Sequence, residues 1–237
     1  MRSVGFSTGA LARADFRAAL VELATHSIAC VELSALRYPE LAPLLDAIPT
    51  LPLAQYRYVS LHAPSQFQGD EEREAARLIE RFVPADWPVI IHPDTILDFK
   101  VWQSFGSRVA IENMDRRKPI GRTAEELARV FEELPLASLC FDIGHARQFD
   151  TTMTEAYRIL QRFRDRICQV HISEVNSASQ HDRLSFASIQ SFRQVANMIP
   201  ESIPVIVESR VREREIEVEI SKAEESLSDP KVARVSA

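Results

Sequence analysis

Short apolar runs alternate with amphipathic segments along the whole chain. Each run has the length of a buried β-strand, about four to eight residues, and most of its side chains are apolar. The runs cover residues 4–8, 28–33, 58–62, 88–92, 108–112, 138–142, 167–172 and 204–208. We therefore expect eight β-strands, spread from one end of the chain to the other.

The segments between these runs have the spacing of amphipathic helices. Residues 72–82 place apolar side chains on one helical face and charged side chains on the other. Similar patterns cover residues 13–25, 123–133, 156–163, 185–198 and 212–227, and weaker ones cover residues 41–45 and 97–105. Two sequences of the form Thr-x-x-Glu, beginning at Thr123 and Thr152, match the capping box that opens a helix. A helix is therefore expected after most of the strands.

Eight strands that alternate with helices predict an α/β fold, a single (β/α)8 TIM barrel. Near-continuous apolar strands are typical of a parallel sheet that is covered by helices, and eight such units fit a chain of 237 residues. An open, doubly wound sheet is the alternative. No linker or shift in composition marks a boundary, so we expect one domain over residues 1–237, with 228–237 as a loose tail.

Six of the apolar runs end in a residue that can bind a metal ion. These residues are His62, His92, Glu112, Asp142, His171 and Glu208. Because all strands of a parallel barrel end at the same face, we expect these side chains to meet there. The segments that follow add further candidates, namely His145, Glu174, Asn176, His181 and Asp182. His26 follows the first predicted helix and is expected at the opposite end of the barrel.

Polar groups at the ends of buried strands are costly unless they bind something. Any one of them could be a hydrogen-bonded structural residue, but six together favour a metal site. Mixed imidazole and carboxylate ligands suit zinc, manganese, iron or cobalt, so we expect a mononuclear or polynuclear site for divalent ions of this kind. Glu32, near the end of the second run, is either a further site residue or half of a buried ion pair.

The strand-end residues resemble those of the xylose isomerase-like TIM barrel superfamily, which includes the endonuclease IV type of nuclease and the ketose 3-epimerases. Resemblance to the nuclease branch implies a first metal on His62, His92 and Glu112, and a second on Glu112, Asp142, His171 and Glu208. It also implies a third metal on His145 and an Asp-Arg-His triplet. This chain reads Asp182-Arg183-Leu184 there, so His181 is the available substitute for the missing His.

Resemblance to the epimerase branch implies a single metal on Glu112, Asp142, His171 and Glu208. Glu112 and Glu208 are then the catalytic base and acid. The residues expected to bind substrate are His145, Glu174, Asn176, His181 and Arg183. That branch has an Arg where this chain has Ser177.

The primary functional prediction is a metal-dependent isomerase or epimerase of a sugar or sugar phosphate. The alternatives are a two- or three-metal phosphoester hydrolase of the endonuclease IV type and a barrel that binds a metal or sugar without turnover. The additional ligands His62 and His92 favour the hydrolase, whereas Leu184 disfavours DNA as its substrate. The expected partner is a small polyol, sugar or phosphoester, and the oligomeric state is left open.

Composition narrows the choice of partner. A net charge of −6 and a pI near 5.6 disfavour nucleic acid. The sequence contains no stretch of about 18 apolar residues that would span a membrane, and residues 1–12 lack the apolar centre of a signal peptide. Cys30, Cys140 and Cys168 lie in apolar runs, which predicts reduced core thiols and a cytoplasmic protein.

Overall fold

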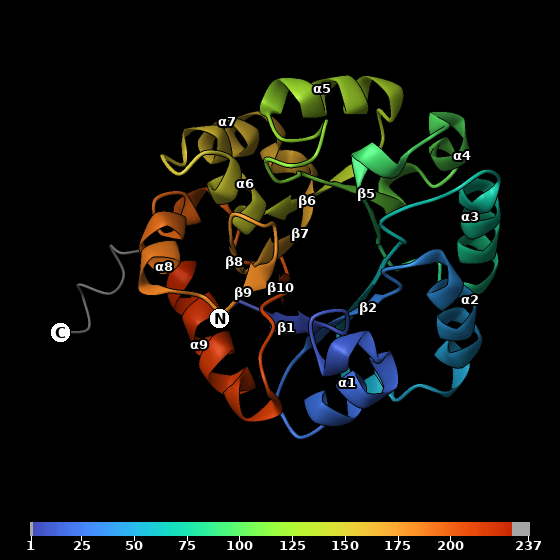
Figure 1. Cartoon of the computed structure of the whole chain (residues 1–237), viewed down its shortest axis with the longest axis horizontal. Coiled ribbons are helices and arrows are strands. Elements are labelled where there is room, and N and C mark those ends of the chain that lie inside the picture. Colours follow the sequence, from blue (N-terminus) through green and yellow to red (C-terminus); the bar gives the residue numbers. More distant parts are fainter. Residues whose placement is uncertain (1, 229–237) are drawn as a thin grey trace.

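The computed structural model describes residues 2–228, so nearly all of the predicted tail lies outside the described residues. Eight parallel strands form a closed barrel in the order β1-β10-β7-β6-β5-β4-β3-β2 (Figure 1). The strands are β1 (Val4–Ser7), β2 (Cys30–Ser34), β3 (Tyr58–His62), β4 (Val89–Ile91), β5 (Val109–Glu112), β6 (Ser138–Asp142), β7 (Ile167–Ile172) and β10 (Val205–Val207). Nearly every strand residue falls within one of the predicted runs. The predicted TIM barrel is confirmed, and the open sheet is wrong because β1 pairs with both β2 and β10.

Helices surround the barrel on its outer side (Figure 1). They are α1 (Phe16–Leu23), α2 (Tyr38–Ala47), α3 (Glu71–Phe82), α4 (Phe99–Gln103), α5 (Ala124–Glu133), α6 (Ile143–Phe149), α7 (Thr154–Phe163), α8 (Phe186–Phe192) and α9 (Ile216–Ser226). Helix α6 was not predicted, and a two-stranded hairpin of β8 (Glu174–Val175) and β9 (His181–Asp182) follows β7. Among the helices of residues 2–228, none is both long and apolar enough to cross a lipid bilayer.

The two predicted capping boxes have different outcomes. Thr123 caps α5 as expected, because its hydroxyl accepts a hydrogen bond from the Glu126 N–H at 3.1 Å. The box at Thr152 is wrong. The N–H of Glu155 donates to the carboxylate of Asp150 at 2.9 Å, and the Thr152 hydroxyl donates to the same carboxylate at 2.7 Å. A carboxylate is a stronger acceptor than a hydroxyl, so Asp150 takes the capping role.

Alternate residues of each strand face the helices and the barrel interior, as the two-residue repeat of a strand requires. The main apolar core lies between strands and helices and includes Val31 and Leu33 but not Glu32. Inside the barrel, a small apolar cluster of Ile90, Ala110 and Cys140 fills part of the space. The three cysteines are free thiols, as predicted.

Candidate metal centre

The predicted ligands lie at the carboxyl ends of six strands, with His92 and Glu208 one residue beyond β4 and β10. Each stands two residues beyond another interior side chain, as His92 stands beyond Ile90 and Glu112 beyond Ala110. The other four pairs are Ser60 and His62, Cys140 and Asp142, Gln169 and His171, and Ile206 and Glu208. The strand repeat therefore places all six ligands in one layer at the carboxyl end of the barrel, as the sequence predicts.

Ligand atoms of eight residues assemble into three adjoining groups, within each of which they lie within 4.8 Å of one another. The first group contains His62, His92 and Glu112. The second contains Glu112, Asp142, His171 and Glu208, and the third contains Asp142, His145 and His181. Glu112 belongs to the first two groups and Asp142 to the last two, so the three groups are linked through shared carboxylates.

Glu112 lies at the centre of this arrangement and is almost completely buried, with 1% of its surface exposed. One carboxylate oxygen lies 3.2 Å from His62 Nε2 and 3.1 Å from His92 Nε2. The other oxygen lies 3.3 Å from His145 Nδ1 and 3.2 Å from His171 Nδ1. Burial raises the pKa of this carboxyl, but the surrounding imidazoles, His171 and His92 foremost, hold it well below its ordinary value.

Two histidines are oriented by hydrogen bonds on the side away from Glu112. His62 donates from Nδ1 to the carbonyl of Ala63 at 2.7 Å, because a carbonyl can only accept. His171 Nε2 lies 2.9 Å from the carboxylate of Glu32. The remaining nitrogen of each ring faces a carboxylate and must therefore carry a proton or a metal ion. This is how ligating histidines are usually held.

Two carboxylate oxygens of the centre have no hydrogen-bond donor among the described residues. They are Asp142 Oδ2, 3.4 Å from His145 Nδ1, and Glu208 Oε2, 3.5 Å from His171 Nδ1. Burial raises the pKa of Asp142 to about 6 and that of Glu208 to about 8. Buried oxygens without donors are costly, and a cation bound between them would remove this cost. The donor set therefore fits a divalent metal.

His145 and His181 complete the third group from different elements. Asp142 caps α6 by accepting the His145 N–H at 2.6 Å, which brings the His145 ring over the barrel. Gly144 allows this approach, because a Cβ there would lie 2.5 Å from the Ser173 carbonyl oxygen. His181 comes from β9, and its ring centroid lies 5.3 Å from that of His145. Burial, with the nearby cation of His145, lowers the pKa of His181 to about 3.

Asp182 does not lie with the other predicted ligands. In the β8–β9 hairpin, neighbouring residues point to opposite faces, so His181 points to the centre and Asp182 points outward. Its exposed carboxylate accepts a hydrogen bond from Asn176 at 2.8 Å. The prediction of Asp182 as a ligand therefore has no geometric support.

Three residues expected to bind substrate have other contacts. Glu174 forms an ion pair with Arg147 at 3.1 Å, and Arg183 pairs with Glu215 at 2.6 Å. Asn176 holds the β8–β9 turn. His26, predicted at the opposite end, belongs to none of the metal groups and lies 2.8 Å from Glu217 of α9.

A cavity of about 420 Å³ lies over the metal groups. Several lining residues were not predicted, and three of them are cationic: Arg117, Lys118 and Arg210. Arg210 stands two residues beyond Glu208, a position that the strand repeat could have indicated. Arg117 and Lys118 lie in the loop between β5 and α5, and periodicity gave no signal for them.

Glu32 lies one interior layer before the metal donors and contacts one of them, His171. It is fully buried, pairs with His171 and accepts a hydrogen bond from Gln169 at 2.7 Å. Gln169 in turn accepts from the Tyr58 hydroxyl at 2.8 Å. Of the two alternatives for Glu32, the structure shows the buried ion pair, and through this pair Glu32 orients His171.

Comparison with sequence models of protein families and with curated protein sequences gave no match. Endonuclease IV from Thermus thermophilus is similar in structure over 95% of this chain and 100% of its own, with 15% sequence identity and a TM-score of 0.59. The 3-keto-D-glucoside 4-epimerase YcjR from E. coli is similar over 94% of this chain and 98% of its own, with 12% identity and a TM-score of 0.55.

A racemase from Streptomyces coelicolor A3(2) with bound magnesium is similar over 86% of this chain and 56% of its own, with 12% identity and a TM-score of 0.53. All three similar structures are those of enzymes, and at these identities the likeness concerns the fold. The chain therefore has the fold of endonuclease IV and of YcjR, which is consistent with the xylose isomerase-like superfamily that its strand ends resemble.

Proposed function

We propose that this chain is a metal-dependent hydrolase of a small phosphoester. The observation that supports this most is the assembly of eight donor residues into three groups linked by Glu112 and Asp142. An isomerase with one ion uses only the second group and gives no reason for the first and third. Leu184 interrupts the third motif of the nuclease branch, and the grouping of His181 with Asp142 and His145 supports His181 as its substitute.

Two or three divalent ions in these groups would activate a water molecule and hold the leaving oxygen of a phosphoester. His62, His92 and Glu112 would hold one ion. Glu112 with Asp142, His171 and Glu208 would hold a second, and Asp142 with His145 and His181 a third. The mixture of imidazoles and carboxylates suits zinc, manganese, iron or cobalt.

The rim of the cavity suits a phosphorylated ligand. Arg117, Lys118 and Arg210 line it, and guanidinium and ammonium groups are the usual partners of phosphate oxygens. A cavity of about 420 Å³ is in the range of small-molecule sites, and the net charge of −6 disfavours a long nucleic acid. We therefore propose a small phosphoester as the substrate.

A second candidate is an isomerase or epimerase of a sugar or sugar phosphate. The specific observation in its favour is that Glu112 and Glu208 belong to one group of four donors, which is enough for a single ion. The surrounding imidazoles hold the pKa of Glu112 well below its ordinary value, so its carboxylate could accept a proton from a sugar carbon. Glu208 could return a proton to the neighbouring carbon through a water molecule.

The two candidates differ in the reaction that the metal-loaded protein catalyses. We expect zinc- or manganese-loaded protein to release phosphate or nitrophenol from nitrophenyl phosphate esters. We also expect Glu112→Gln to abolish this activity while the circular dichroism spectrum stays unchanged. Glu132→Gln is the matched control, since Glu132 lies exposed on α5. Exchange of a sugar proton with solvent, without ester hydrolysis, would support the isomerase. Full activity in Glu112→Gln would contradict both roles.

A further inference from the structure

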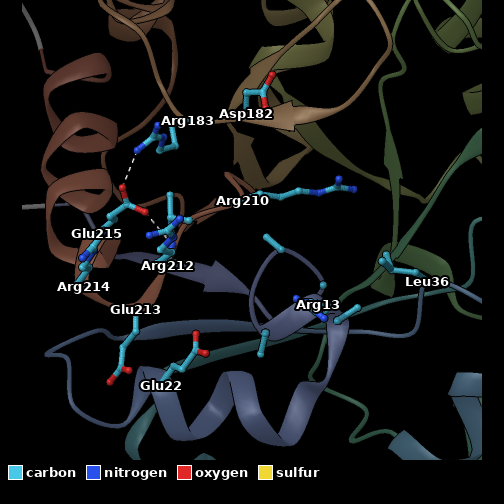
Figure 2. A pocket seen from close by; sticks show the side chains of 15 residues that line it. Arg13, Glu22, Leu36, Asp182, Arg183, Arg210, Arg212, Glu213, Arg214 and Glu215 are labelled. Atoms are coloured by element: carbon cyan, nitrogen blue, oxygen red, sulfur yellow. Dashed lines mark hydrogen bonds and ion pairs between the residues drawn. The ribbon is translucent and has the colours of Figure 1, made fainter.

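A second and larger cavity, of about 1060 Å³, shares lining residues with the cavity over the metal groups. Figure 2 shows the side chains that line it. The loops after β1 and β10 line it, together with part of the β8–β9 segment. Leu36 and Arg210 line both this cavity and the one over the donors, so the two spaces meet. We call it the arginine cleft, after its lining residues Arg13, Arg183, Arg210, Arg212 and Arg214.

Among the arginines of the cleft, only Arg183 has an ion-pair or hydrogen-bond partner for its guanidinium group within the described residues. Arg183 pairs with Glu215, which also accepts the backbone N–H of Arg212 at 3.1 Å. By contrast, neither Arg13 nor Arg210 has an ion pair or side-chain hydrogen bond within residues 2–228. In Figure 2, Arg210 extends across the open space, away from the Arg183–Glu215 pair.

The acidic residues of the cleft lie away from the part that meets the cavity over the metal groups. Glu22 and Glu213 lie well away from Arg210, on the side of α1 (Figure 2). Asp182 is engaged by Asn176. Arg212 and Arg214 also lack a guanidinium partner among the described residues, but they lie on the side of Glu215 (Figure 2). Arg13 and Arg210 lie toward Leu36, where the two cavities meet, and each guanidinium group can offer several N–H donors to one anion.

The loop that carries Arg13 has a strained backbone. Ala12, Arg13 and Ala14 have φ values of 46°, 57° and 66°, in the left-handed region that residues other than glycine rarely adopt. The turn is held by a hydrogen bond from the Ala14 N–H to the carbonyl of Leu11, which is fully buried. Backbone strain that the fold retains is concentrated at binding sites and ligand clamps.

We infer that the arginine cleft binds a second phosphate group of the substrate while the metal donors hold the reacting phosphoester. Two unpaired guanidinium groups provide the charge for one phosphate monoester, whereas a nucleic-acid backbone would meet Glu22, Glu213 and Asp182 as well. The inference rests on the proposed function only in its statement that the other end of the substrate reacts at the metal donors. Binding of a phosphate by the arginines of the cleft does not require a metal ion.

The binding test uses protein stripped of metal by a chelator and inorganic phosphate as the probe. Titration calorimetry should show phosphate binding that Arg13→Ala and Arg210→Ala each weaken by about tenfold or more. Arg129→Ala should leave the affinity unchanged, because Arg129 lies on α5, away from both cavities. Absence of phosphate binding, or equal binding by wild type and Arg13→Ala, would overturn the inference.

A kinetic test separates the cleft from the metal centre. With metal-loaded protein, Arg13→Ala should lower kcat/KM for a sugar bisphosphate by about tenfold and leave that for nitrophenyl phosphate nearly unchanged. Equal losses for both substrates would place Arg13 at the reacting end and overturn the inference. Arg13-dependent binding of a DNA duplex in preference to phosphate would also overturn it. If neither ester is hydrolysed, the proposed function is wrong, and the phosphate titration still tests whether the arginine cleft binds phosphate.

Discussion

At the level of single residues, the buried carboxylate of Glu32 orients one of the predicted metal ligands, His171. Glu32 has no contact with solvent, and its carboxylate fixes the His171 ring from the side opposite Glu112. Such a carboxylate selects the ring nitrogen that is left to bind the metal. Burying the charge is tolerable because His171 and Gln169 both face it.

We predict that Glu32→Gln weakens metal binding by about 10- to 100-fold, because the amide no longer holds His171 as strongly. Competition with a chromogenic chelator measures this affinity directly. Ser60→Ala is a control in the same interior layer. It removes only the long hydrogen bond of 3.5 Å from the Ser60 hydroxyl to Glu32 and leaves the contact between Glu32 and His171 in place. Ser60 belongs to none of the donor groups. An unchanged metal affinity in Glu32→Gln would mean that Glu32 is only a packing residue.

Protonation of the centre should make the stability of the metal-free protein depend on pH. Burial raises the pKa of Asp142 to about 6 and that of Glu208 to about 8. Burial alone would lower the pKa values of His62 and His145, but neighbouring carboxylates, Glu112 among them, raise them to about 9 and 10. The folded protein therefore binds these protons more tightly than the unfolded chain does.

Stability from groups with a raised pKa is complete below their ordinary values and is lost as the pH rises through the folded values. We predict that the thermal midpoint of the metal-free protein falls between about pH 6 and pH 9. Metal-loaded protein should not show this fall, because bound metal ions replace the protons. A thermal midpoint of the metal-free protein that rises over this range would show that the folded protein does not bind these protons more tightly than the unfolded chain.

At the level of elements, the β8–β9 hairpin decides which of two adjacent ligand candidates reaches the centre. The pairing of Val175 with His181 and of Glu174 with Asp182 sends these two pairs to opposite faces. The sequence offered both His181 and Asp182, and a strand of two residues has no detectable periodicity. Only the register of the hairpin could separate the two candidates.

We predict that His181→Ala removes one metal ion or weakens its binding, whereas Asp182→Ala changes the metal content little. The reason is that His181 lies in the third donor group and the Asp182 side chain bonds only to Asn176 among the described residues. Elemental analysis of the two purified variants measures the difference. The opposite result would mean that the hairpin register is shifted by one residue.

Strand ends were easier to predict than loops for a physical reason. A strand with a two-residue repeat and a known carboxyl end fixes the direction of its last side chains, so Glu112 and His171 followed from the sequence. Loop residues such as Arg117 and Lys118 depend on turn geometry that no period encodes. The failed cap at Thr152 has a similar origin, since Asp150 reaches the helix only through the shape of its turn.

At the scale of the whole molecule, the closed barrel converts residues far apart in sequence into one site. Eight apolar runs with helices between them were enough to predict this architecture, and enzymes of 12–15% identity share it. The pattern of buried positions, more than the identity of each residue, determines the fold. The identity of the strand-end residues determines what the fold can bind.

The number of metal ions per chain tests the account most directly. Native mass spectrometry together with elemental analysis should find two or three divalent ions in the wild-type protein. His62→Ala should hold one ion fewer, because His62 belongs only to the first donor group. A wild-type protein that holds a single ion, with the same content in His62→Ala, would contradict the linked metal centre and the hydrolase that we propose from it.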